Sequence, residues 1–246
     1  MLYNKPSNTR TNLIYQALNI EFQKNIKDIY IENGNWTIVR SSFSNLVQLE
    51  QQIAKLPYNG CGLKKDEAVE NTLFPPFLQV FYYLIYQHKS IPNEELYFSE
   101  YLKWLNVDPK TNGQFAYQGN MYSIEGLKAR ALRAYPSLIR DIHFYYFLLE
   151  SKEFENVKYS MHADYYEGLD ILVTRQDVTY GVSILINTKR GAAFKKLKER
   201  RHNYENNIKE IILKVDFSEL HKNGNFYLLD KEQLKRLLSE IGTTKT

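Results

Sequence analysis

The chain has 246 residues, of which 43% are hydrophobic, and this is enough for one large domain or for a core with a helical extension. Its single cysteine, Cys61, excludes an intramolecular disulfide and a cysteine-based zinc cluster, and it favours a reducing compartment. The net charge of +4 is too small to indicate a partner, so local clusters of charge matter more than the total. The sequence has no run approaching about 18 apolar residues and no secretory pattern at its start, so we expect a cytoplasmic protein that does not enter a membrane.

The first half of the sequence predicts mostly helices. In chain order, helices are expected over 9–28, 44–56, 65–86 and 93–105. A short strand is expected at 36–39, and Pro75–Pro76 should interrupt the third helix. Asn93 and the acidic residues after it favour the start of the fourth helix, because negative charge there complements the helix dipole.

Two clusters of turn-forming residues end this helical part. They lie at 108–113 and 117–120, and no periodic pattern runs through them. We place a domain boundary there. The sequence therefore predicts a mostly helical N-terminal domain over 1–116 and an α/β core over 117–246.

Residues 123–150 predict a long helix that Pro136 interrupts. Proline removes a main-chain donor and crowds the preceding turn, so we expect a short helix to about residue 134 and a longer one from about Pro136. Arg133 and Arg140 are among the basic residues of this region. They can contact a nucleic-acid phosphate, or they can form ion pairs with acids such as Asp141.

Two adjacent strands carry the most informative polar residues. The expected strands and the polar connection between them are 169–173, 182–188 and 174–179. Asp170 opens the first strand, and Asn187 and Lys189 end the second. Because side chains alternate along a strand, Asn187 and Lys189 point to the same face. We therefore expect an acid, an amide oxygen and an ammonium group to converge.

This pattern resembles the PD-(D/E)XK nuclease superfamily, whose core is a helix, three strands, a second helix and a further strand. In that family an Asp opening the second strand and an acidic-x-Lys on the third hold a divalent metal and orient a water for phosphodiester cleavage. Asp170 matches the first acid and Lys189 the lysine, whereas Asn187 stands where the family usually has Glu or Asp. The resemblance implies a Mg²⁺ or Mn²⁺ site with Asp170 and Asn187 as ligands and Lys189 acting on the water.

A further carboxylate is expected at this site, because Mg²⁺ prefers anionic oxygen ligands and an Asn oxygen carries no charge. Resolvase-like members of the superfamily place an acid on the helix before the strands, and Asp141 is the best positional match. The loop 161–167 also offers acids just before the strand, among which Glu167 ranks next. The resemblance thus implies Asp141 and Glu167 as additional ligands, with Asp141 also a catalytic residue.

The segment after Lys189 is the most basic of the chain. Residues 191–202 predict a helix with a narrow apolar stripe. The basic residues in and before it are Arg190, Lys195, Lys196, Lys198, Arg200 and Arg201. Such a cluster suits contacts with nucleic-acid phosphates, which are electrostatic and largely independent of sequence. A solvated helix face is the alternative reading of the same residues.

The end of the chain predicts two further strands, at 211–215 and 225–228, and a closing helix that Asp230 caps. The tail is expected to cover or extend the sheet. The predicted fold is α/β, of the α+β type: a PD-(D/E)XK-like mixed sheet flanked by helices, with a mostly helical N-terminal part.

The function that this resemblance implies is a Mg²⁺-dependent endonuclease in a bacterial defence system or a mobile element. DNA is expected as the substrate rather than RNA, and a second copy or another protein is a further expected partner. The alternative is a catalytically degenerate module that binds nucleic acid or protein, which the Asn187 position favours.

Overall fold

The structure is a computed structural model. It describes residues 31–32, 35–36, 43–60, 62–108, 110–159, 163–164, 168–187 and 208–243. The chain forms two compact units, of which unit 1 comprises Met1–Gly34 and Leu56–Leu138, and unit 2 comprises Asn35–Lys55 and Ile139–Thr246. The helix α7 (Ile124–Ser151) contributes to both units. The expected boundary between two separate domains at residues 116–117 stays a prediction.

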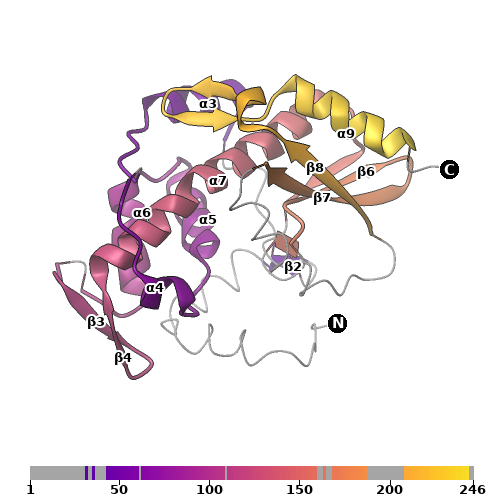
Figure 1. Cartoon of the computed structure of the whole chain (residues 1–246). Helices are drawn as coiled ribbons and strands as arrows, with labels where there is room; N and C mark the ends of the chain where they lie inside the picture. Colours follow the sequence, from indigo (N-terminus) through magenta and orange to yellow (C-terminus); the bar gives the residue numbers. More distant parts are fainter. Residues whose placement is uncertain are drawn as a thin grey trace. The chain divides into compact units, whose positions relative to one another are not determined.

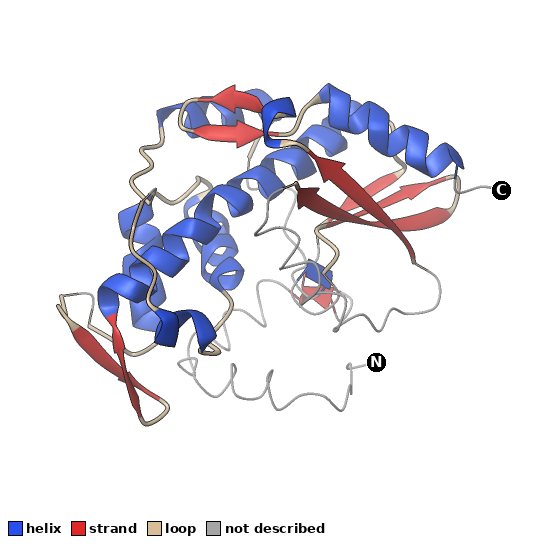
Figure 2. Cartoon of the chain, in the orientation of Figure 1, coloured by secondary structure: helices blue, strands red, loops and turns tan. Residues whose placement is uncertain are grey.

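Unit 1 is built mainly from helices (Figures 1 and 2). In chain order its described elements are β1 (Ile31–Glu32), α4 (Glu67–Asn71), α5 (Phe77–His88), α6 (Glu94–Trp104), β3 (Gln114–Tyr117), β4 (Asn120–Ser123) and the first part of α7. The side chain of Asp66 accepts from Val69 N at the start of α4, and that of Asn93 accepts from Leu96 N at the start of α6. The helices predicted over 65–86, with their interruption, and over 93–105 are thus confirmed.

The turn cluster at 117–120 closes a hairpin that the sequence analysis did not predict. Strands β3 and β4 pair antiparallel, with Tyr117 opposite Asn120. The two residues between them, Gln118 and Gly119, both have positive φ angles, of 48° and 80°. This backbone suits a two-residue hairpin turn. The strands are only four residues long, so their alternation is too short to separate them from a loop.

The expectation that Pro136 splits the long helix is wrong, because α7 is continuous over 28 residues with Pro136 inside it. Proline cannot donate to the carbonyl group of Leu132, four residues earlier. The hydroxyl group of Tyr58 approaches this carbonyl oxygen at 3.4 Å and supplies a donor in place of the missing N–H. A contact distant in sequence therefore supports the helix at the proline.

Unit 2 contains a mixed four-stranded sheet. Its strands are β5 (Asn156–Lys158), β6 (Ile171–Arg175), β7 (Val178–Ile186) and β8 (Lys209–Val215), and they lie in this order. The pairs β5–β6 and β6–β7 are antiparallel, whereas β7 and β8 are parallel. The predicted strands at 169–173, 182–188 and 211–215 correspond to β6, β7 and β8. The connection expected over 174–179 is shorter, because only Gln176 and Asp177 separate the paired strands.

Further elements of unit 2 are β2 (Asn35–Trp36), α3 (Leu46–Lys55), the 3₁₀ turn η3 (Phe217–Glu219), β9 (His221–Asn223), β10 (Phe226–Leu228) and α9 (Lys231–Thr243). The helix expected over 44–56 is α3, and Trp36 of the strand expected at 36–39 lies in β2. Residues 37–39 and the helices expected over 9–28 and 191–202 lie outside the described residues. The carboxylate of Asp230 accepts from Glu232 N at the start of α9, which confirms the predicted cap. Helix α9 packs on β8, and α3 packs on β9 (Figure 1).

The predicted strand at 225–228 forms β10, but it does not join the four-stranded sheet. It pairs antiparallel with β9 in a separate two-stranded sheet. The turn between them contains Gly224, whose φ angle is +59°, and a Cβ atom there would lie 2.6 Å from the carbonyl oxygen of Ala54. Glycine is therefore required for this close approach to α3. The fold as a whole combines helices with a mixed sheet, so the predicted α+β class is confirmed.

Candidate metal centre

Three aspartates of unit 2 come together at the start of β6. Asp141, Asp164 and Asp170 each place a carboxylate oxygen within 4.8 Å of those of the other two. They are contributed by α7, by the short segment 163–164 and by the residue just before β6. The structure thus brings together the two acids that the resemblance pairs, Asp141 and Asp170, and adds Asp164. We call these three residues the acid cluster.

Asp170 is held by the neighbouring strand β7. Its main-chain N–H donates to Val182 O at 2.8 Å, and its side-chain Oδ2 accepts from Ile184 N at 2.5 Å. The residue is only 6% exposed. The hairpin register places Ile171 opposite Val182, so Asp170 lies one step further along, where β6 begins and β7 continues. Main-chain groups of a rigid hairpin therefore orient this carboxylate.

Asp164 is held by hydrogen bonds from both sides along the chain. The Tyr159 hydroxyl donates to Asp164 Oδ2 at 2.7 Å, and Gly168 N donates to the main-chain oxygen of Asp164 at 3.2 Å. Tyr159 is itself buried. A buried hydroxyl that donates to a carboxylate fixes its direction, as the outer partners of metal ligands do.

The acid cluster fits a small divalent cation. Two oxygen ligands on opposite sides of Mg²⁺ are about 4.2 Å apart, and adjacent ligands are closer, so oxygens within 4.8 Å can reach one ion with small side-chain movements. Carboxylate oxygens are the ligands that Mg²⁺ and Mn²⁺ prefer. Like charges held this close repel one another, and a bound cation would relieve that repulsion.

Arg140 is a positive group that lies near the acid cluster. Its Nε donates to Tyr227 O at 3.0 Å. Burial lowers the pKa of its guanidinium, while the charges of Asp141 and Asp170 raise that pKa. An arginine stays charged in a protein, so Arg140 interacts favourably with two of the three carboxylates of the acid cluster, those of Asp141 and Asp170. The structure therefore associates Arg140 with the cluster, and its predicted contact with nucleic acid stays a prediction.

Asn187 lies at the end of β7 and bonds to the end of β8. Its side-chain Nδ2 donates to Asp216 Oδ1 at 2.7 Å, and its main-chain N–H donates to Val215 O at 2.8 Å. The side chain is exposed. In the structure its amide nitrogen is thus used to join two strand ends, and its predicted role as a metal ligand stays a prediction.

Arg133 has a different surrounding from Arg140. Its Nη2 forms an ion pair with Glu70 Oε1, and its side chain is 12% exposed. The alternative of an ion pair, left open by the sequence, is therefore the one that the structure shows, although the partner is Glu70 rather than an acid of the same helix.

Several predicted residues lie outside the described part of the chain. They are Glu167, Lys189, Arg190, Lys195, Lys196, Lys198, Arg200 and Arg201. Their predicted roles as ligand, catalytic lysine and phosphate contacts stay predictions.

Asp164 is the residue of the acid cluster that the sequence analysis did not single out. It belongs to the acidic loop 161–167, in which Glu167 is the residue ranked after Asp141, and Glu167 lies outside the described residues. The sequence of this loop contains no periodic signal that would place Asp164 beside Asp141. A tyrosine five residues before an aspartate is too weak a pattern to identify this arrangement.

Comparisons with protein-family models, curated proteins and solved structures give no match to this chain. None of the helices in the described ranges has the length and apolar character needed to cross a membrane.

Proposed function

We propose that the chain is a metal-dependent nuclease that hydrolyses phosphodiester bonds of DNA. The observation that carries this proposal is the acid cluster, in which Asp170 at the start of β6 is joined by Asp141 from the preceding helix. The order α7, β5, β6, β7 and β8 supports it, because it agrees with the helix and strands of the core that the resemblance implies.

The residues of the site have three different roles in this proposal. Asp141, Asp164 and Asp170 hold the cation through their carboxylate oxygens. When bound there, a cation would supply a Lewis acid for the phosphate and would lower the pKa of a coordinated water. Arg140 opposes the negative charge that the phosphate brings toward the cluster. Lys189, which follows β7 in the sequence, orients the attacking water or accepts its proton.

The basic residues between Arg190 and Arg201 support nucleic acid as the substrate class. They follow the strand that positions Asp170, and their side chains suit phosphate contacts. DNA is the substrate proposed, and the account needs no preference for particular bases, because phosphate contacts carry no base information.

The test is cleavage of plasmid and single-stranded DNA by the purified chain with Mg²⁺ or Mn²⁺, against a reaction with EDTA. Asp170→Asn and Lys189→Ala should each abolish cutting. Asp177→Asn is the matched control, because Asp177 is an exposed aspartate in the β6–β7 turn and lies outside the acid cluster. Cutting that survives EDTA, or full activity of Asp170→Asn, would contradict the assignment.

A non-catalytic module that binds nucleic acid or protein is the second candidate. The side-chain amide of Asn187 favours it, because this residue brings no charge to the position of the family's second acid and donates to Asp216 instead. This candidate predicts that the chain binds DNA but leaves it intact with every divalent cation tested. Substituting Asn187→Glu would then add an anionic oxygen and should tighten metal binding if the position borders the site.

A further inference from the structure

Strand β8 is the outermost strand of the four-stranded sheet in the described part of the chain. It pairs with β7 on one side, and the sheet order ends with it. The outer strand of a sheet presents main-chain N–H and C=O groups that can pair with another strand. The chemistry of this edge therefore determines what can add to it.

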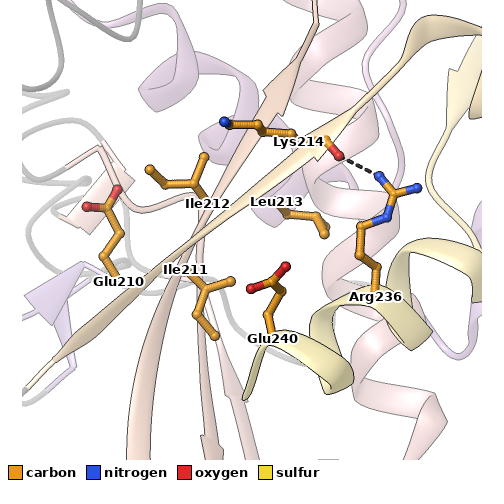
Figure 3. A pocket seen from close by; sticks show the side chains of 7 residues that line it. All are labelled: Glu210, Ile211, Ile212, Leu213, Lys214, Arg236 and Glu240. Carbon is orange, nitrogen blue, oxygen red and sulfur yellow. Dashed lines mark hydrogen bonds between the residues drawn. The ribbon is translucent and has the colours of Figure 1, made fainter. Parts of the chain in front are cut away.

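Main-chain groups of alternate residues of β8 point to opposite sides. Val215 O accepts from Asn187 N, so Val215 faces β7. Lys214 O points the other way, because it accepts from Nη1 of Arg236 on α9 at 2.6 Å (Figure 3). By this alternation the N–H and C=O groups of Glu210, Ile212 and Lys214 all face away from β7.

An open hollow of about 520 Å³ runs along the same strand. It is lined by residues 210–214 of β8 and by Arg236 and Glu240 of α9 (Figure 3). Figure 3 shows Glu210 and Lys214 at the two ends of this stretch, with Ile212 between them. The described residues thus leave room beside the outward-facing groups of β8.

We propose that two copies of the chain associate through this edge, with their β8 strands antiparallel and their two Ile212 residues opposite each other. In this register Glu210 of each copy lies opposite Lys214 of the partner subunit, which gives two pairs of opposite charge. Glu210 Oε1 already accepts from Ser183 Oγ at 3.0 Å, so the pairing adds a second contact to a carboxylate that is held in its own copy. All three outward-facing residues of each strand then lie opposite outward-facing residues, as a hydrogen-bonded antiparallel ladder requires. The second copy is the occupant because the charges of the strand are complementary to themselves after a two-fold rotation.

Other antiparallel registers lose this complementarity. A pairing centred on residue 210 would place two glutamates opposite each other, and one centred on residue 214 would place two lysines opposite each other. Like charges directly opposite in a sheet destabilise it. A pairing centred on residue 211 or 213 places Glu210 or Lys214 opposite Ile212. It also leaves one outward-facing charged residue of each strand without a residue of opposite charge across from it.

Arg236 must release Lys214 O when the second copy binds. Its Nη2 also bonds to Glu219 Oε1 at 2.9 Å, and this ion pair can persist while Nη1 moves away. The main-chain N–H of Glu210 of the partner subunit then takes the place of Nη1 at Lys214 O. The exchange replaces one hydrogen bond by another, so it does not oppose association strongly.

The test is the molar mass of the full chain by sedimentation over a concentration series, with charge-reversal variants. The wild-type chain should form dimers. Glu210→Lys and Lys214→Glu should each weaken self-association about tenfold or more, because each places like charges opposite each other twice. The double variant Glu210→Lys/Lys214→Glu should restore it, and mixing the two single variants should give a heterodimer. Lys222→Glu, a reversal at an exposed lysine of β9, is the control and should leave the dimer unchanged.

A wild-type chain that stays monomeric at every concentration would overturn the proposal. A dimer that neither single variant weakens would also overturn the proposal, as would a double variant that is folded by circular dichroism but does not dimerise.

Cross-linking tests the register independently of the charges. Ile212→Cys should form an intermolecular disulfide under mild oxidation, because residues opposite each other in a hydrogen-bonded pair have Cα atoms about 5.5 Å apart. Thr174→Cys on β6 and the wild-type chain, whose single cysteine is Cys61, are the controls and should not cross-link. Failure of Ile212→Cys to cross-link in a chain that dimerises would contradict this register.

Discussion

Unit 1 and the acid cluster of unit 2 differ in which charges lie close together. In unit 1, buried charge is matched by partners of the same unit. The carboxylate of Glu94 accepts hydrogen bonds from the main-chain N–H groups of Asn59 and Gly60 at 2.8 and 2.9 Å, and Arg133 pairs with Glu70. In unit 2, the acid cluster gathers three carboxylates of the same sign. Matched charge stabilises a fold, whereas like charges held close repel one another, and a bound cation would reduce that repulsion. We therefore interpret the first arrangement as structural and the second as the candidate for metal binding.

The largest effect on stability is expected at Glu94 of unit 1. Replacing the buried Glu94 by Ala leaves the N–H groups of Gly60, which is buried, and of Asn59, which is exposed, without their acceptor. We expect a loss of about 3 kcal/mol in the free energy of unfolding, measured by urea denaturation. Binding of Mn²⁺ by the folded fraction should be unchanged. A stable variant, with less than about 1 kcal/mol lost, would show that the matched charges of unit 1 contribute little.

The acid cluster should respond differently. Asp141→Asn removes the repulsion from two like charges but also the attraction to Arg140, so the stability of the metal-free chain should change little. The same variant should lose the stabilisation that metal gives the wild type, which is about 2.7 kcal/mol at a free concentration of 100 times Kd. Thermal unfolding with and without Mn²⁺ measures both effects. A metal-free chain that is strongly destabilised by Asp141→Asn would mean that Asp141 is a structural residue.

A matched pair inside unit 2 gives an intermediate effect. His143 is 2% exposed, and its Nε2 lies 3.0 Å from Glu50 Oε1. Burial lowers the pKa of His143, and the hydrogen bond to Glu50 opposes that change only in part. Below a pH of about 6.5 the unfolded chain therefore takes up a proton that the folded chain does not. The free energy of unfolding should therefore keep its full value above this pH. On acidification it should fall by up to about 1.4 kcal/mol per pH unit, until the pH reaches the lower pKa that His143 has in the folded state.

Replacing His143 by Gln should remove this part of the pH dependence. The measurement is the urea midpoint at pH 7.5 and pH 5.5, and His88→Gln, at an exposed histidine of α5, is the control. An unchanged pH dependence in His143→Gln would show that His143 does not control the acid sensitivity of unit 2.

The smallest effect is expected at the β6–β7 turn. Gln176 and Asp177 have φ angles of 53° and 62°, which favour Asn and Gly over the residues present. The Glu155 carboxylate accepts from Gln176 N at 2.6 Å and from Asp177 N at 3.3 Å, which supports this turn. Asp177→Gly should raise the free energy of unfolding by up to about 1 kcal/mol, because relief of the left-handed backbone exceeds the entropy that glycine adds to the unfolded chain, and it should leave metal affinity unchanged. A change of metal affinity would show that the turn and the acid cluster are coupled.

Local sequence signals predicted much of the fold. A proline pair and polar capping residues predicted where α5, α6 and α9 begin, and apolar alternation predicted β6, β7 and β8. These features depend on neighbouring residues, so they can be found without tertiary information. The continuity of α7 could not, because it depends on Tyr58, which is far from Pro136 in the sequence. The separate β9–β10 sheet is equally non-local, since its turn is selected by the approach to Ala54.

The candidate site was predicted in part for the same reason. The pairing of Asp141 with Asp170 followed from a resemblance in the order of elements, and the structure places both in one cluster. Asp164 joins them through contacts that no pattern of spacing predicts, such as the hydrogen bond from the Tyr159 hydroxyl. The side-chain nitrogen of Asn187 bonds to Asp216 after the end of the parallel strand β8, and the predicted role of Asn187 as a metal ligand stays a prediction.

The central claim is that Asp141, Asp164 and Asp170 bind one divalent cation together, and calorimetric titration of the full chain with Mn²⁺ tests it most directly. We predict that the wild-type chain and Asp177→Asn bind equally well, and that Asp164→Asn and Asp170→Asn each bind at least tenfold more weakly. Asp164→Asn is the decisive variant, because the structure alone adds this residue to the cluster. Absence of binding by the wild-type chain, or wild-type affinity in Asp164→Asn, would contradict the account.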